Sequence, residues 1–224
     1  MPSLENKSVQ PDAAYWSLRL LSLLQQMAEQ NTNAVMTLLT DVDQLETDRR
    51  YPDAGLSFGG GRWRAYYHCH ETVSMHASEH GHFHLFTESG DRSWAHVAGL
   101  SIDAEGQPLQ WFAVNRWVTD GPWLARESFP DQLDYLSAKD EALVANWLAV
   151  LLQLYRDPLY DLLCERDRQI QQHSKTGSVA ETLENRELYT LATRSIALQS
   201  MLENQLLASP TNRDESAWLS NNVR

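Results

Sequence analysis

The chain has 224 residues, of which 42% are hydrophobic and 21% are charged, and its formal net charge is −12. This composition is typical of a globular protein and excludes a largely disordered chain. The acidic balance argues against nucleic acid and a membrane as partners, because both present negative charge. With two cysteines, Cys69 and Cys164, and a polar stretch at residues 1–12 that lacks the apolar core of a signal peptide, the sequence predicts a cytoplasmic location.

The first part of the chain, residues 11–50, is expected to be helical. Apolar residues recur at three- and four-residue steps from Tyr15 to Ala28, which indicates an amphipathic helix. Residues 34–45 predict a second, shorter helix. Residues 51–61 contain one proline and four glycines, and this composition predicts a loop.

The middle of the chain, residues 62–123, is expected to form a sheet. Its segments are rich in aromatic and β-branched residues, and turn residues separate them. Because they follow one another through short links without intervening helices, we expect an antiparallel meander. The four predicted strands are residues 62–71, 79–87, 94–102 and 109–118.

The last part, residues 131–207, is expected to be helical again. Two helices are predicted at residues 133–155 and 159–173, and the leucine spacing predicts a long third helix from Ser178 to Leu206. The sequence thus predicts a single domain of the α+β class, in which N-terminal and C-terminal helices flank a four-stranded antiparallel sheet. The long terminal helix would pack within the chain or form a homodimer.

The histidines are the feature that carries chemistry. Six of the eight lie between His68 and His84. His68 and His70 are two residues apart on one predicted strand, and the same step relates His80, His82 and His84 on the next. Because side chains alternate across a strand, each set is expected to project from one face.

Several neutral imidazoles that converge on one point suit a transition metal, since iron, copper, zinc and nickel all accept nitrogen ligands. Without an ion, buried imidazoles would lose solvation and would repel one another once protonated. We therefore predict a metal site whose ligands come from five histidines. They are His68, His70, His80, His82 and His84, with His80 as a fifth ligand or a base.

Other side chains near these histidines are weaker candidates. Glu71 and Glu79 are placed by strand parity on the opposite faces, from which they could ligate or accept a ring N–H. Cys69 also faces away from His68. His96, on the next predicted strand, could join the cluster. The sequence leaves these four roles open.

Three residues are candidates for contact with a small-molecule substrate. Arg64 and Tyr66 share strand parity with His68, and Arg116 is one of few cations in the sheet region. An arginine beside a metal site can hold a carboxylate through two hydrogen bonds. Pairing of either arginine with one of the many acidic residues is the alternative. Tyr66 is a candidate redox or proton-donating residue, or an aromatic wall.

Two resemblances are carried by short motifs. The segment His-Gly-His-Phe-His-Leu-Phe, residues 80–86, resembles the signature of the histidine-triad nucleotide-binding family, which implies His82 as a nucleophile toward a nucleotide phosphate. A broader pattern resembles an uncharacterised bacterial family of unknown function, and it implies that the sheet region is the functional unit. Its motifs are residues 66–70, 79–86, 115–119 and 121–123.

The sequence thus favours a metal-dependent oxidoreductase that uses iron or copper and acts on a small molecule. A zinc-dependent hydrolase, a non-catalytic copper or zinc carrier and a histidine-triad-like nucleotide hydrolase or transferase remain alternatives.

Overall fold

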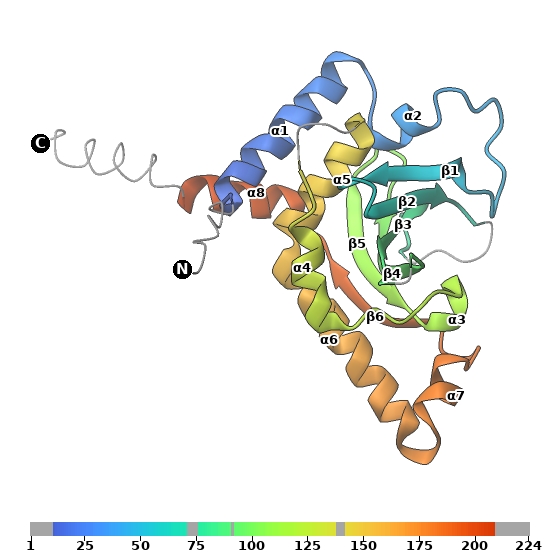
Figure 1. Ribbon diagram of the computed structural model, residues 1–224. Coiled ribbons are helices and arrows are strands. Elements are labelled where there is room, and N and C mark those ends of the chain that lie inside the picture. The colour runs from blue at the N-terminus through green and yellow to red at the C-terminus, as the bar shows by residue number, and fades with distance from the viewer. Residues whose placement is uncertain (1–10, 71–75, 91, 138–141, 209–224) are drawn as a thin grey trace, which may run out of the picture.

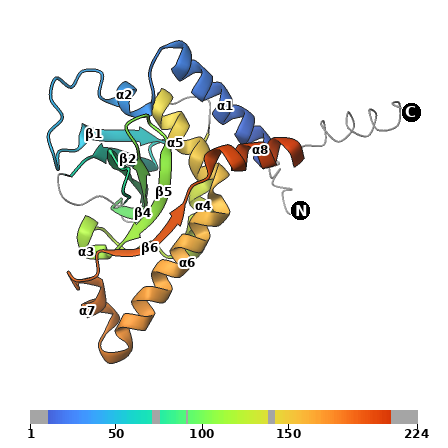
Figure 2. The same cartoon turned by 180° about the vertical axis from the view of Figure 1, so that it is seen from behind.

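The computed structural model describes residues 11–70, 76–90, 92–137 and 142–208. Within these ranges a single antiparallel sheet packs against a layer of helices, as Figures 1 and 2 show from opposite sides. The six strands lie side by side in the order in which they occur in the sequence. They are β1 (Tyr51–Phe58), β2 (Trp63–His68), β3 (Gly81–Glu88), β4 (Trp94–Ile102), β5 (Pro108–Val114) and β6 (Thr190–Ser195).

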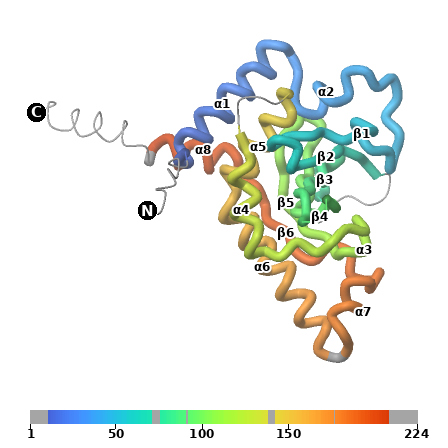
Figure 3. The backbone as a smooth tube through the Cα atoms, in the orientation of Figure 1, coloured from blue at the N-terminus to red at the C-terminus, as the bar shows by residue number. Residues whose placement is uncertain are grey.

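In chain order, α1 and α2 precede the sheet, α3 to α7 lie between β5 and β6, and α8 follows β6. Figure 3 traces this path from α1 into the sheet and then through α5 and α6 back to β6. The helices are α1 (Ala13–Glu29), α2 (Ala34–Leu38), α3 (Arg116–Thr119), α4 (Phe129–Leu133), α5 (Leu143–Leu154), α6 (Arg156–His173), α7 (Val179–Leu183) and α8 (Leu198–Ala208).

The predicted N-terminal helix is confirmed as α1. The carboxylate of Asp12 caps it by accepting a hydrogen bond from the Tyr15 amide, 2.9 Å away. Its buried side, which includes Leu20, Leu23 and Met27, belongs to the hydrophobic core. Capping and an apolar stripe at helical spacing therefore fix this element from local sequence alone.

Helix α5 is the centre of the core. Ten of its residues, from Val144 to Gln153, are buried. The ring of Trp147 lies 6.0 Å from that of Phe83 on β3, so the helix covers one face of the sheet. No helix among the described residues has both the length and the apolar character that crossing a membrane requires.

The sheet has six strands, so the prediction of four is wrong. Residues 51–58, predicted as a loop, form the edge strand β1. Gly55 has a φ of 73°, and the register between β1 and β2 shifts between Tyr51 and Leu56. Glycine and proline are tolerated at such an irregular edge, where the sequence signal resembles that of a turn.

The long helix predicted from Ser178 onward is also wrong. Helix α7 ends at Leu183, and residues 190–195 pair with β5 as β6 before α8 begins. The leucine spacing does not reveal this, because pairing with β5 buries Leu191 and Ala192 in a strand instead.

Smaller differences concern the ends of elements. The predicted helix over 34–45 stops at Leu38, and the predicted strand over 109–118 stops at Val114. The prediction of one helix over 133–155 corresponds to the end of α4 and to α5, with residues 138–141 outside the described part. Pro158 lies in the first turn of α6, where no helical hydrogen bond needs its missing N–H.

Candidate metal centre

The two faces of β2 and β3 have different chemistry. Tyr67 and Phe83 point into the helix-covered core. The alternate positions form the opposite face, on which His68 lies opposite His82 and Tyr66 opposite His84. The predicted strand parity is thereby confirmed for His68, His82 and His84, and the register of the two strands brings them together.

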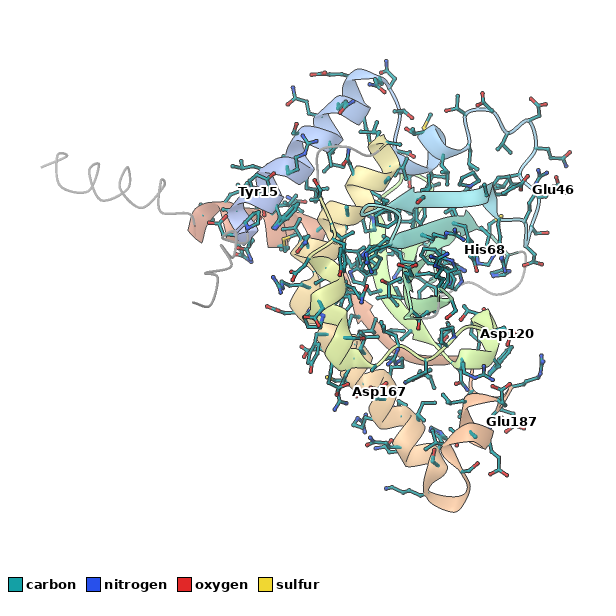
Figure 4. The ribbon with its side chains drawn as sticks, in the orientation of Figure 1. Tyr15, Glu46, His68, Asp120, Asp167 and Glu187 are labelled. Carbon is teal, nitrogen blue, oxygen red and sulfur yellow. The ribbon has the colours of Figure 1, made fainter. Side chains whose placement is uncertain are left out.

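These three histidines form the candidate site. Each offers one ligand atom, and the three atoms lie within 4.8 Å of one another, close enough to hold a metal ion. The residues His82 and His84 are only 1% and 2% exposed. Figure 4 labels His68 beside the strands of the sheet, where several nitrogen-bearing side chains lie.

The ring of His82 is held from behind by a carboxylate. Its Nδ1 lies 2.5 Å from Oε1 of Glu79, whose side chain is 2% exposed. When Nδ1 carries the proton and donates it to this carboxylate, Nε2 is unprotonated and its lone pair can bind a metal ion. That Nε2 lies 2.7 Å from Nε2 of His68, near the separation of about 3 Å expected for two nitrogens bound at about 2.0–2.1 Å to one ion.

His70 offers a fourth nitrogen next to the three. Its Nδ1 hydrogen-bonds the carboxylate of Asp48. Its Nε2 is buried and has no hydrogen-bond partner among the described residues. The ring lies 4.5 Å from that of His68 and 5.3 Å from that of His82. An imidazole with one nitrogen on a carboxylate and the other nitrogen buried and unsatisfied has the donor arrangement of a metal ligand.

Burial favours the neutral form of His68 and His84, the form in which a histidine binds a metal. It lowers the pKa of His68 to about 3, with smaller effects from His82 and His70. Burial likewise lowers the pKa of His84 well below its usual value, and His96 adds to the effect. The Nδ1 of His84 lies 2.9 Å from Nε2 of His96, which places His96 behind His84 and leaves the other nitrogen of His84 for an ion.

A phenylalanine closes the other side of the site. The ring of Phe112 lies edge-on to His82 at 5.2 Å and to His84 at 5.7 Å. It passes directly over Gly99, where a Cβ atom would lie 2.0 Å from its Cζ. Glycine at position 99 thus makes room for the ring that shields the histidines from water.

Tyr66 borders the cluster as the sequence predicts. Its ring lies 5.5 Å from that of His68 and 5.4 Å from that of His84. Burial raises the pKa of its hydroxyl, while the nearby Arg50 acts in the opposite direction. The guanidinium of Arg50 lies over the tyrosine ring at 4.6 Å.

Other predicted residues lie elsewhere. His80 precedes β3, and its Nδ1 lies 2.5 Å from the hydroxyl of Tyr67 on the opposite face, so strand alternation does not apply to it. Arg116 forms an ion pair with Glu184. Cys69 is buried, and burial raises its pKa. Glu71 lies outside the described residues.

The structure adds site residues that sequence reasoning missed. Asp48 belongs to a predicted helical region, and Phe112 appears in the sequence only as one apolar strand residue among many. Tyr189 precedes β6, and the pKa of its hydroxyl is raised by burial and by Asp48 and Glu79. Asp48 and Phe112 meet the histidines only through contacts distant in sequence, so no local signal marks them.

Comparison with known protein families shows to which family the chain belongs. Residues 16–196 match the family described as a domain of unknown function, DUF6969. The match covers more than half of the 224 residues, so the chain belongs to this family. No curated protein and no solved structure matches it.

Proposed function

We propose that the protein is a metal-dependent oxidoreductase that uses iron or copper at a histidine centre. Its ligands would be His68, His82 and His84, with His70 as the fourth. The observation that carries this proposal is the convergence of three ligand nitrogens within 4.8 Å. The unsatisfied Nε2 of His70 supports the fourth position. A bound iron or copper ion would supply electron-transfer or O₂ chemistry at this nitrogen-rich site.

The carboxylates at the centre, among the described residues, are not placed as the general base of a zinc hydrolase would be. A hydrolytic site commonly uses a carboxylate as a general base toward bound water. Here Glu79 and Asp48 lie behind His82 and His70, on the Nδ1 atoms. In that position they orient the rings and increase their basicity.

The aromatic side chains would perform the remaining tasks. Burial keeps the Tyr66 hydroxyl protonated at neutral pH, so this residue can donate a proton or hydrogen atom to a substrate beside the cluster. Phe112 and Phe86 cover the histidines and exclude water.

A histidine-triad reaction is less well supported by this geometry. It would need His82 free to attack a phosphate. Both ring nitrogens of His82 are already in contact, one with Glu79 and one with His68. The first histidine of the motif, His80, contacts Tyr67 instead.

The metal content of untagged protein tests the proposal. We expect about one iron or copper ion per chain by elemental analysis, with a visible absorption band on exposure to O₂. The double variant His82→Ala with His84→Ala should lose the ion. The control is His173→Ala, because His173 is exposed on α6. Slow loss to a chelator is expected of a resident cofactor, and exchange within minutes would indicate a carrier.

Clear results would contradict the proposal. Full metal occupancy in the folded double variant would reject these ligands. A stable zinc ion with no affinity for iron or copper would replace the oxidoreductase by a zinc site. Nucleotide phosphoramidate hydrolysis that resists chelation and needs His82 would favour the histidine-triad alternative.

A further inference from the structure

A cavity of about 550 Å³ opens beside the histidine centre. Strands β1 to β3, the start of β4 and the loop after α3 line it. Tyr66 and Phe86 belong both to this cavity and to the shell of the centre, since their rings lie 5.4 Å and 6.4 Å from that of His84. A molecule in the cavity would therefore lie one aromatic ring away from the candidate ligands.

Two arginines, Arg50 and Arg64, line the cavity. Arg50 lies over the ring of Tyr66 at 4.6 Å, and Arg64 lies over the ring of Trp94 at 4.0 Å. Neither forms an ion pair with a described residue. By contrast, Arg49 pairs with Glu46 and Asp53. Stacking on an aromatic ring fixes the plane of a guanidinium and leaves its N–H groups for a ligand.

The acidic residues of the cavity do not cancel this charge. Asp53 is bound by two nitrogens of Arg49, at 3.2 Å and 3.1 Å. Asp120, at the end of α3, is the other carboxylate among the lining residues, and Figure 4 shows it near α3. The lining thus contains two guanidinium groups and, in Asp120, one carboxylate for which the described part of the chain offers no arginine partner.

We infer that this cavity binds a small organic carboxylate, held by Arg50 and Arg64. The inference deepens the proposed function, because it names the substrate class of the same centre. A guanidinium matches the two oxygens of a carboxylate. The volume is that of a small-molecule site. Rings of Tyr66, Phe86 and Trp94 offer an apolar wall for the body of the ligand.

Binding of aryl carboxylates tests this inference. The probes are benzoate, phenylacetate and 3-phenylpropionate, each compared with its neutral amide by isothermal titration. We expect at least one carboxylate to bind with an affinity about 10- to 100-fold higher than that of its amide, as is typical of hydrogen bonds to a charged group. Arg50→Gln and Arg64→Gln should each weaken binding by a similar factor. Arg62→Gln, which removes an exposed pair with Glu88, should not.

The measurements are made on chelator-treated protein and on metal-loaded protein. Carboxylate binding without any metal uptake would reject the proposed metal centre and support the carboxylate site. Normal metal uptake without carboxylate binding up to 10 mM would support the metal centre and reject the carboxylate site. Equal binding of acid and amide, unchanged affinity in both arginine variants, or tighter binding of phenyl phosphate than of every carboxylate would overturn the inference.

Discussion

The carboxylate behind His82 offers a sharp test of the metal centre. In Glu79→Gln the side chain keeps an oxygen that accepts from Nδ1 of His82, so the ring orientation and tautomer should persist. The negative charge that makes the ring a stronger donor is lost. Removing such a partner typically weakens metal binding 10- to 100-fold, about 1.4–2.7 kcal/mol.

The effect can be read as a change in stability. At a free metal concentration 100 times the wild-type Kd, binding adds about 2.7 kcal/mol to the free energy of unfolding. A variant that binds 10- to 100-fold more weakly would gain only about 0.4–1.4 kcal/mol at the same concentration. Urea unfolding with Zn²⁺ as a redox-inert probe, compared with chelator, measures this increment separately from any change in the metal-free protein.

Glu105→Gln is the matched control, because Glu105 is exposed in the turn between β4 and β5. It should keep the full increment. If Glu79→Gln also keeps it, Glu79 does not support a metal ligand and the orientation assigned to His82 is wrong.

Three further outcomes are expected. Gly99→Ala should lower the free energy of unfolding by about 1–3 kcal/mol, since the new Cβ would overlap the Phe112 ring; adding Phe112→Leu should recover part of this loss, and additive losses would refute the packing. Asp48→Asn should weaken metal binding if His70 is a ligand, and unchanged affinity by titration would remove His70 from the set. Burial, helped by Arg166, lowers the pKa of His96 from 6.5 to about 3. Between pH 6.5 and about 3, His96 is therefore protonated in the unfolded chain only. The free energy of unfolding then falls as the pH falls through this range. In chelator-treated protein, His96→Gln should reduce this slope by up to about 1.4 kcal/mol per pH unit, and an unchanged slope would show that His96 is not buried in a neutral form.

The regular parts of the fold follow from local sequence. Helix α1 has its capping aspartate and an apolar stripe, and the segments of β2 to β5 have aromatic residues and turn signals between them. The two added strands do not. In the segment of β1, residues such as Gly55 predict a loop, and the leucines around β6 have helical spacing. Both strands exist because a neighbouring strand pairs with them, and such pairing lies outside any local window.

The site divides in the same way. The two-residue step in the sequence determines by itself that His82 and His84 share a face of β3, whereas His70 lies just beyond the end of β2, where strand alternation does not apply. Tertiary structure alone decides that His68 lies opposite His82, that His80 precedes β3, and that Asp48 from a distant segment lies behind His70. Side-chain parity depends only on backbone geometry within one strand, whereas convergence depends on register and on loops, which the whole chain fixes together.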